Sequence, residues 1–343
     1  MNCKPIQSPW TRTAKNIAAA AVVAGAIFPL CALAQAPIVI KFSHVAAIDT
    51  PKGQAALFFK KRAEELSKGG VKVEIYPNSQ LYKDKEELEA LQLGSVQMLA
   101  TVPGKFGPMG LKEFEAFDLP YLFQDEAGVH RVTRGPLGAS LLNKLESRGI
   151  HGLAFWDAGF RVVSSNKPMH VPGDLKGMKI RISSSKVNQA IYKSLGALPQ
   201  TMAFSEVYQA LQTGVVDGAD GNMPNLYTQK QYEVQKHVTM TNHTFSGYVV
   251  VTNKAFWEKL PPAIRSNIET AVKEATEYND KIAEEDNAKS IAAIAASGKT
   301  TIYTPTAQEK ALWVKATQPV MDEMAPRIGK EMIESMRKEA AGK

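Results

Sequence analysis

Cysteine is nearly absent from this chain of 343 residues. Its two cysteines, Cys3 and Cys31, both lie within the first 34 residues. The sequence after residue 34 therefore offers no disulfide, no thiolate nucleophile and no cysteine ligand for a metal. A chain of this length buries enough apolar surface to fold without disulfides, and its length favours two domains.

The sequence also lacks the residue patterns of familiar catalytic centres. None of its six histidines pairs with another at the spacing that puts two metal ligands on one helix face. Ser183-Ser-Ser-Lys186 matches a Ser-x-x-Lys element, but the companion Ser-Asp-Asn and Lys-Thr-Gly motifs do not occur. Pro108 interrupts a glycine series that is spaced wrongly for a dinucleotide loop: Gly104, Gly107 and Gly110. We therefore predict no enzymatic activity, no metal and no cofactor.

Long apolar runs are confined to the N-terminus. Three basic residues precede an apolar stretch from Ile17 to Leu33 that contains no acidic residue. The stretch ends in Ala32-Leu-Ala34, the small-x-small pattern that signal peptidase requires. These features predict a signal peptide over residues 1–34, cleavage after Ala34 and a location in the periplasm.

Two other interpretations of this segment are weaker. A membrane anchor needs roughly 20 apolar residues, and this run of about 17 is interrupted by Pro29. A lipid on Cys31 is disfavoured by the same proline. Cleavage removes three basic and no acidic residues, so the net charge falls from +7 to +4. The remaining basic residues are interspersed with acidic ones, which argues against a nucleic-acid partner.

After residue 34, strand patterns alternate with helix patterns. Residues 37–42 form an apolar run of strand length, Thr50-Pro51 begins a helix, and residues 71–76 alternate as a strand does. A strand, a helix and a strand in about 40 residues form a βαβ unit. We predict further helices over 84–93, 186–195 and 205–211, and further strands over 96–102, 149–155, 161–165, 178–182 and 215–216.

The C-terminal third is mostly helical. One helical pattern runs from Pro261 to about Ala296, and roughly 36 residues at 1.5 Å each exceed 50 Å, more than the width of one domain. Thr306-Ala-Gln-Glu309 matches a capping box, and the tail from Arg327 to about Ala340 is also helical.

We therefore predict an α/β fold of two lobes braced by the long helix. The predicted lobe I is 35–158 plus 247–286, and lobe II is 159–246 plus 287–343, with crossovers near 156–160 and 245–248.

Two arginines stand at positions suited to holding an anion. Arg181 ends a predicted strand beside Ser183–Ser185, the predicted start of a helix. A guanidinium next to free helix N–H groups and hydroxyls favours a carboxylate. Arg161 begins a neighbouring strand 20 residues earlier and could reach the same cleft. Taken alone, each arginine is more often a surface salt-bridge partner.

A longer segment, Met202–Gly218, resembles the signature of the solute receptors of tripartite ATP-independent periplasmic (TRAP) transporters of the C4-dicarboxylate type. Lys176–Arg181, Tyr232–His243 and Asp118–Tyr121 are similar to the same family. The resemblance implies a two-lobed periplasmic binding protein with a ligand cleft between its lobes. It also implies a small organic acid as ligand and a TRAP-type integral membrane permease as partner. We further expect a monomer.

The resemblance implies roles for single residues. Arg181 matches the arginine that pairs with the substrate carboxylate, and Arg161 matches a second arginine that assists it. Phe204 matches an aromatic residue that packs on the ligand, and Ser184 a polar residue that assists. Many members have an asparagine where Gly221 stands here, so we include Gly221 and the following Asn222 as site candidates.

Other candidates are weaker, and the ligand stays open. His44 and Gln80 follow the first two predicted strands, and Lys85 stands at the start of the next predicted helix. All three are candidate cleft contacts, although each is more often an ordinary loop residue. Neither Thr101 nor Val102 supplies the acidic group that some members have there. A C4-dicarboxylate or a related hydroxy or keto acid is the favoured ligand. The alternatives are uronates or aromatic acids, a receptor for an ATP-driven importer, and a periplasmic enzyme on a similar frame.

Overall fold

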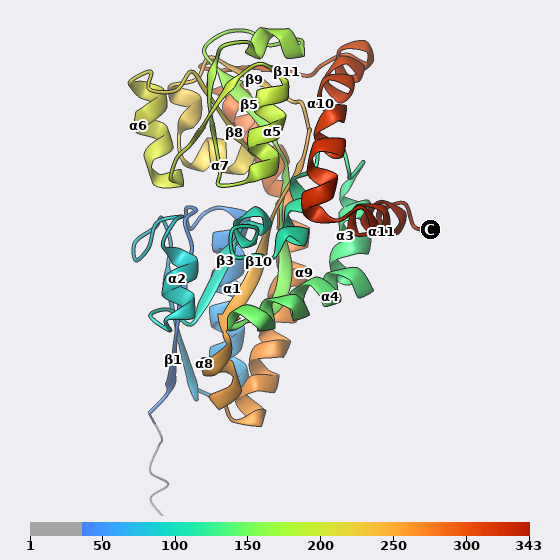
Figure 1. Ribbon diagram of the computed structural model, residues 1–343. Helices are drawn as coiled ribbons and strands as arrows, with labels where there is room; N and C mark the ends of the chain where they lie inside the picture. Colours follow the sequence, from blue (N-terminus) through green and yellow to red (C-terminus); the bar gives the residue numbers. More distant parts are fainter. Residues whose placement is uncertain (1–35) are drawn as a thin grey trace, which may run out of the picture. The chain divides into compact units, whose positions relative to one another are not determined.

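Residues 36–343 build two β-sheets with helices packed around them in this computed structural model, which describes that part of the chain (Figure 1). The predicted signal peptide and its cleavage site after Ala34 lie outside the described residues. Within residues 36–343, no helix has the length and apolar character that crossing a membrane requires.

The first sheet has the strand order β2-β1-β3-β10-β4, and we call the part of the molecule built on it lobe I. Its strands are β1 (Ile38–Ser43), β2 (Val71–Tyr76), β3 (Met98–Thr101), β4 (Ile150–Phe160) and β10 (Phe245–Asn253). The second sheet has the order β11-β9-β5-β8-β6-β7 and defines lobe II. Its strands are β5 (Val162–Ser165), β6 (Lys179–Ile182), β7 (Leu198–Thr201), β8 (Gly218–Gly221), β9 (His237–Thr239) and β11 (Thr301–Tyr303). The predicted two-lobed α/β fold is confirmed.

Helices cover both sheets. Those that pack on lobe I are α1 (Pro51–Leu66), α2 (Glu87–Gln92), α3 (Glu126–Arg134), α4 (Pro136–Lys144) and α8 (Lys254–Lys259). Those of lobe II are α5 (Lys186–Ser194), α6 (Val207–Gln212) and α7 (Met223–Thr228). The C-terminal part adds α9 (Pro262–Ala296), α10 (Ala307–Ile328) and α11 (Lys330–Ala340).

The first βαβ unit forms as the sequence predicts. The Thr50 hydroxyl accepts a hydrogen bond from the Gly53 N–H at 3.2 Å, which caps α1, and Pro51 occupies its first turn. Strand β1 then pairs in parallel with β2, with Ile38 opposite Val71. This arrangement carries the first residues of α1 to the edge of lobe I that faces lobe II.

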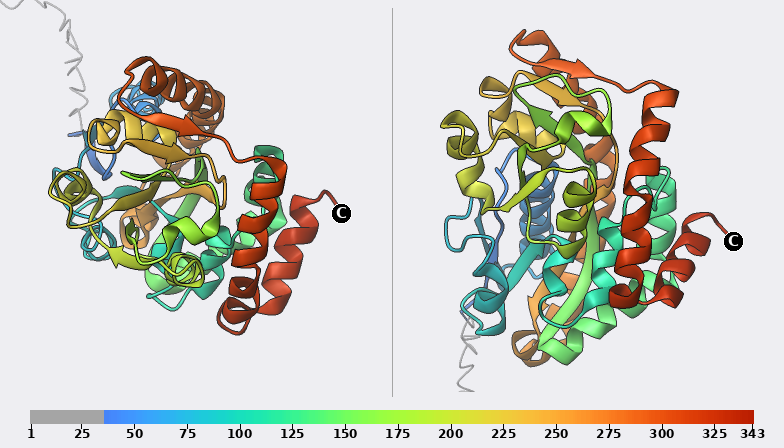
Figure 2. Two further views of the ribbon diagram at one scale, coloured as in Figure 1. Left: turned by 90° about the horizontal axis from the view of Figure 1, so that it is seen from above. Right: turned by 45° about the horizontal axis from the view of Figure 1, so that its top comes forward.

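The long helix α9 is confirmed, with 35 residues. It packs on α1 and β4 in lobe I and on α7 and β11 in lobe II. Two contacts fasten it to β4: the Trp156 indole N–H donates to the Thr276 hydroxyl at 3.0 Å, and the Asp157 N–H donates to the Asn279 side-chain oxygen at 2.6 Å. The helix therefore joins the two lobes on one side of the molecule (Figure 2).

The first crossover between the lobes differs from the prediction. The sequence predicted a strand that ends at residue 155, whereas β4 continues to Phe160 and pairs with β10 along almost its full length. The pairing is irregular between Phe245 and Gly247. Arg161 follows directly, and β5 begins one residue later in the other sheet. The crossover is thus the end of a paired strand, with no loop.

Two other local predictions are wrong. Residues Val215 and Val216 form no strand, because the strand of lobe II begins at Gly218, and Val215 is 56% exposed. The helix predicted from Asp84 begins at Glu87, since residues 84–86 form a turn in which the Lys83 N–H donates to Glu86. Asp84 is thereby left in front of the helix, with its side chain free to bond elsewhere.

The C-terminal helices touch both lobes. The predicted capping box is confirmed: the Thr306 hydroxyl accepts from the Glu309 N–H at 3.3 Å, and the Glu309 carboxylate accepts from the Thr306 N–H at 2.7 Å. Helix α10 packs on α5 of lobe II, whereas α11 packs on α3 of lobe I (Figure 1). The sequence assigned this whole tail to lobe II, so the exact division of the chain into lobes stays a prediction.

Candidate ligand-binding cleft

A small cavity of about 50 Å³ lies where the two lobes face each other. Lobe I and its strand β10 contribute Val45, Ala46, Lys52, Asp84, Val102, Ser246 and Tyr248 to its wall. The β4–β5 crossover and lobe II contribute Arg161, Arg181, Ser183, Phe204, Asp220, Gly221, Asn222 and Asn225. Five of the nine residues predicted from the sequence are therefore brought together in one place: Arg161, Arg181, Phe204, Gly221 and Asn222.

Arg181 is buried in the wall of this cavity, with 4% of its surface exposed. Its Nε and Nη2 both donate to the Met202 carbonyl, at 3.2 and 2.9 Å, and its guanidinium lies 5.6 Å from the centre of the Phe204 ring. Burial lowers the pKa of Arg181 to about 10, although the charge of Asp84 opposes the shift. The Met202 carbonyl thus holds one edge of the guanidinium, and the end that carries Nη1 stays available to an anion.

Arg161 lines the cavity and also belongs to a buried network. It forms an ion pair with one oxygen of Asp220. The other oxygen accepts from the Tyr192 hydroxyl at 2.9 Å and lies 3.0 Å from His243 Nε2. Burial would raise the pKa of Asp220, but the charge of Arg161 and these hydrogen bonds lower it to about 2. The charge of Arg161 is therefore balanced inside the protein, and the network fixes where its guanidinium lies.

Lys52 reaches the cavity from the first turn of α1 and is 1% exposed. Its ammonium group donates to the Ala100 carbonyl at 3.2 Å and lies 3.8 Å from the centre of the Tyr248 ring. Burial lowers the pKa of Lys52 to about 8, while Glu87 opposes the shift. The group is therefore still mostly charged at neutral pH.

Gly221 and Asn222 stand where the sequence departs from the pattern of the family. The Asn222 side chain caps α7 by accepting from the Asn225 N–H at 3.0 Å, and it donates to the Ser246 hydroxyl at 3.1 Å. A Cβ atom on Gly221 would meet no other atom within 4 Å. The glycine therefore leaves open space beside the cavity, and much of the asparagine's bonding capacity is used within the protein.

The other four predicted residues do not line the cavity. Ser183 lines the cavity in place of its neighbour Ser184. Ser185 caps α5 by accepting from the Asn188 N–H at 3.2 Å. Gln80 and Lys85 are exposed. His44 is fully buried, and neither of its ring nitrogens has a hydrogen-bond partner within the described part of the chain. Burial and the nearby charge of Lys52 lower the pKa of His44 to about 3, so it is neutral.

Several cavity residues were missed by sequence reasoning, and two of them carry signals that could have been used. Lys52 lies in the first turn of a helix, where a positive charge opposes the helix dipole and so has little local justification. Asp220 lies within a short buried strand, where an unpaired carboxylate would be costly. Asp84 and Ser246 carry no comparable local signal.

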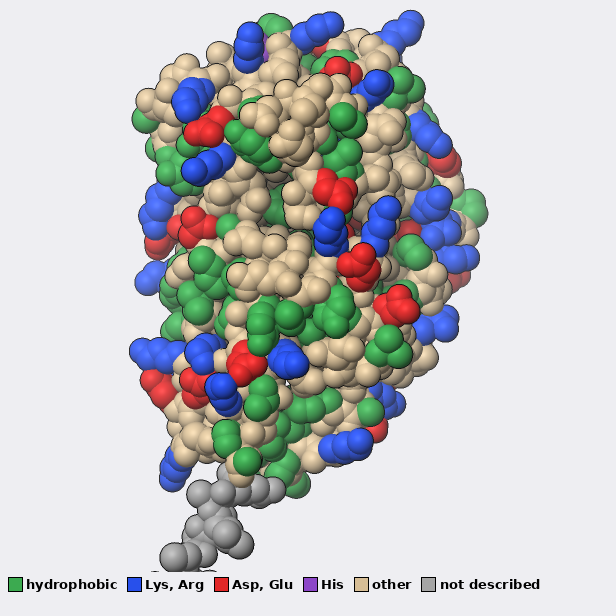
Figure 3. Space-filling model, turned by 90° about the vertical axis from the view of Figure 1, so that its left-hand side faces the viewer, with side chains coloured by type: hydrophobic (Ala, Val, Ile, Leu, Met, Phe, Trp, Pro, Cys, Tyr) green, Lys and Arg blue, Asp and Glu red, His purple; other side chains and the backbone are tan. Residues whose placement is uncertain are grey.

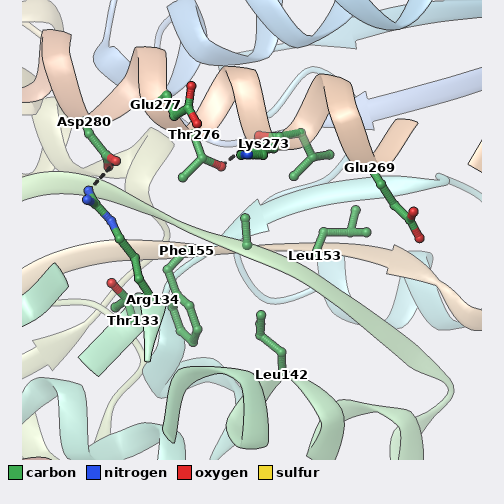
Figure 4. Close-up of a pocket in the computed structure, with 12 residues that line it drawn as sticks. Thr133, Arg134, Leu142, Leu153, Phe155, Glu269, Lys273, Thr276, Glu277 and Asp280 are labelled. Carbon is green, nitrogen blue, oxygen red and sulfur yellow. Dashed lines mark hydrogen bonds and ion pairs between the residues drawn. The ribbon is translucent and has the colours of Figure 1, made fainter. Parts of the chain in front are cut away.

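A second pocket, of about 420 Å³, lies between α9, β4 and the helices α3 and α4 (Figure 4). Its floor is apolar, and at one end Arg134 forms an ion pair with Asp280. None of the predicted site residues lines it. Its lining has two basic and three acidic residues, so it favours an anion less than the cleft does.

Two α/β lobes, a helix that joins them and a charged cavity between them define a two-lobed solute-binding protein. The comparisons with known proteins agree. The family model for bacterial extracellular solute-binding protein, family 7 (DctP), matches residues 42–327. The chain belongs to this family, as the resemblance to TRAP solute receptors predicted, and the predicted periplasmic location is confirmed.

Individual relatives cover nearly the whole chain. The C4-dicarboxylate-binding periplasmic protein DctP of Rhodobacter capsulatus is 56% identical over 301 residues, which cover 88% of this chain and 90% of the relative. A TRAP periplasmic solute binding protein from Shewanella oneidensis, solved with bound succinate, has a TM-score of 0.87 at 40% identity, covering 89% of this chain and 100% of that one. Another, from Pseudomonas aeruginosa with bound L-malate, has a TM-score of 0.81 at 41% identity, covering 84% and 100%.

Proposed function

We propose that this protein captures a C4-dicarboxylate, or a closely related hydroxy or keto diacid, and delivers it to a TRAP-type membrane permease. One observation carries the proposal. Arg181 and Lys52 line one cavity from opposite lobes, and neither forms an ion pair within residues 36–343. Each donates only to a neutral backbone carbonyl. A buried charge without a counter-ion is costly, so both cations favour an anion in the cavity.

The positions of the two cations fit a ligand with two carboxylates. One carboxylate would accept from the free end of the Arg181 guanidinium, with Phe204 packed beside it. The other would meet the Lys52 ammonium. A cavity of about 50 Å³ holds only a few water molecules, each of which needs roughly 10–15 Å³ by this measure. A four-carbon diacid fits this space better than a uronate or an aromatic acid does.

The remaining predicted residues take supporting roles in this proposal. Arg161, fixed by Asp220, adds positive potential behind the first carboxylate. The space beside Gly221 accommodates a substituent such as the hydroxyl of malate, and Asn222 shapes that wall. The protein binds its ligand without changing it chemically, acts as a monomer, and presents its closed form to the permease.

Electrostatics outside the cleft support a small anionic ligand over a polyanion. On the face drawn in Figure 3, Lys and Arg side chains are interspersed with Asp and Glu. A polyanion such as nucleic acid needs a continuous basic track. The positive charge that matters here is instead concentrated in the cavity.

The test is calorimetry on the purified protein without its first 34 residues. Succinate, fumarate and L-malate should bind, and butyrate, which lacks the second carboxylate, should bind at least about 10-fold more weakly, since an unpaired buried cation costs more than 1.4 kcal/mol. Lys52→Met should remove most of this preference, because the thioether keeps the volume of the side chain without its charge. Equal affinity for succinate and butyrate in the unsubstituted protein would contradict the proposal, and tight binding of galacturonate alone would favour the uronate alternative.

A further inference from the structure

A carboxylate of lobe I is hydrogen-bonded to the backbone of lobe II at the edge of the cavity. Asp84 Oδ2 accepts from the Phe204 N–H at 2.6 Å. Phe204 is the first residue of a short 3-10 helix, Phe204–Glu206, that leads into α6. The first N–H groups of a helix have no partner within it. Asp84 therefore supplies, from the opposite lobe, a bond that lobe II does not provide for itself.

Asp84 is held firmly on the side of lobe I. Its Oδ1 accepts from the Lys105 ammonium at 2.8 Å, and Lys105 also bonds Glu87 at 2.6 Å. The side chains of Lys105 and Glu87 are 5% and 1% exposed. Burial would raise the pKa of Asp84, but Lys105 and the Phe204 N–H lower it, so the carboxylate is ionised at neutral pH. Because this cluster is built into lobe I, Asp84 cannot follow Phe204 when the lobes separate.

The segment that Asp84 contacts is the same one that orients Arg181. The Met202 carbonyl accepts from two nitrogens of the Arg181 guanidinium, and two residues later the Phe204 ring lies against that guanidinium. The Phe204 N–H points to Asp84. Three consecutive residues thus connect the cation that faces the cavity with the bond between the lobes.

We propose that Asp84 is a closure latch: it bonds the Phe204 N–H only when the lobes are closed and thereby slows the release of the ligand held at Arg181. This inference rests on the proposed function, since it concerns the same cleft. Asp84 acts through the segment 202–204, so it is a positioning residue. A ligand on Arg181 orders this segment, and the ordered segment presents its N–H to Asp84. An ionised acceptor makes a stronger hydrogen bond than a neutral one, so the latch favours the closed form.

Dissociation kinetics of succinate, measured by stopped flow, test the latch. Asp84→Ala should release succinate about 10- to 100-fold faster, the range expected for losing a hydrogen bond to a charged group, while the association rate changes less than about threefold. Asp84→Asn keeps an acceptor for the Phe204 N–H but loses the charge. Its release rate should therefore lie between the rates of the unsubstituted protein and of Asp84→Ala. Unfolding midpoints without ligand show whether each variant is folded. If Asp84→Ala does not fold, Asp84→Asn still tests the latch.

The matched control is the neighbouring residue Lys83, which also bonds across the lobes. Its ion pair with Glu206 at 3.0 Å is 51% exposed on both sides. Such a pair contributes little, so Lys83→Met should release succinate within about threefold of the unsubstituted rate. A release rate for Asp84→Ala within the same threefold range would overturn the latch, as would a change confined to the association rate.

Interlobe distances separate failure of the latch from failure of the proposed function. Residues 36–343 contain no cysteine, so Glu89→Cys on α2 and Gln209→Cys on α6 give two specific spin-label positions on exposed residues of the two lobes. With saturating succinate, the Asp84→Ala background should retain more of the long-distance form than the Lys83→Met background. If the unsubstituted protein binds no organic acid, the proposed function fails. In that case the interlobe distances measured without ligand test the latch. Equal distance distributions in the Asp84→Ala and Lys83→Met backgrounds would overturn the latch as well.

Discussion

Among single residues, Arg181 is expected to contribute most to affinity. Arg181→Ala would leave the ligand carboxylate buried without its partner, which costs roughly 2–5 kcal/mol, or about 30-fold to several-thousand-fold in affinity. Arg181→Lys keeps the charge but loses the planar fork, so it should restore only part of the affinity. Calorimetry with succinate measures both.

Arg161 is the informative comparison for Arg181. Its ion pair with Asp220 means that Arg161→Ala leaves a buried carboxylate unpaired, so the ligand-free melting temperature should fall. Arg181→Ala breaks no ion pair within the described residues and should change the melting temperature much less. Binding of succinate by a folded Arg181→Ala within threefold of the unsubstituted protein would place the anchor elsewhere.

His44 gives the fold a specific pH dependence. Its folded pKa of about 3 lies below the value near 6.5 of an unfolded histidine. Between these values the unfolded chain binds a proton that the native state excludes, so stability is complete above pH 6.5 and falls as the pH drops towards 3. By pH 4 this loss amounts to about 3 kcal/mol, at 1.36 kcal/mol per pH unit.

His44→Leu removes this group and isolates its contribution. Urea unfolding at pH 8 and at pH 4 should show a loss of stability on acidification that is smaller in the variant by about that amount. If both proteins lose the same stability between the two pH values, His44 is not excluded from protonation in the native state.

For whole elements, the attachment of α9 to β4 is the feature most open to test. Asn279 is fully buried, and its side chain accepts from the Asp157 N–H and donates to the Asp157 carbonyl. Asn279→Leu keeps the approximate volume and removes both of these hydrogen bonds. We expect a loss of about 2–4 kcal/mol in the free energy of unfolding, measured with urea.

The control for this attachment lies on the exposed face of the same helix. Glu285→Ala removes an exposed side chain and its exposed ion pair with Lys289, and it should change stability by less than about 0.5 kcal/mol. A similar small effect for Asn279→Leu would mean that apolar packing alone holds α9 on β4.

For the whole molecule, ligand should make the protein more compact. The lobes are joined by α9 and by the paired strands β4 and β10, and we predict that they rotate about the crossovers near residues 156–160 and 245–248. Small-angle scattering should show a smaller radius of gyration with saturating succinate. An unchanged profile would argue against closure, because a ligand shifts a conformational equilibrium only through different contacts in the two states.

Elements of the fold could be predicted where their signals lie in neighbouring residues. Three local features were predicted correctly for this reason: the helix start at Thr50-Pro51, the capping box at Thr306 and the long helix α9. Val215 and Val216 have strand propensity, but the partner strands of the sheet pair with residues 218–221 instead. Strand pairing is a tertiary property, which short runs of residues do not determine.

Residues of the candidate site could likewise be predicted only where the sequence around them carries a signal. Arg181 and Phe204 were found because they stand in long motifs that resemble a known family, and both line the cavity. Asp84 was missed because nothing next to it in the sequence distinguishes a cavity residue from a surface residue, and Lys52 carried only the signal of a basic residue in the first turn of a helix. His44 was predicted as a contact, yet the fold buries it completely.

The fold class, the family and the long helix could be predicted from the sequence, since each depends on local patterns or on motifs of many residues. The tertiary structure decided which charges stay uncompensated. Arg161 and Arg181 both stand at one end of a strand pattern in the sequence, but of the two only Arg161 forms an ion pair within the described residues, because β8 places Asp220 beside it. The charge balance of a buried site depends on residues distant in the sequence, and only the folded chain brings them together.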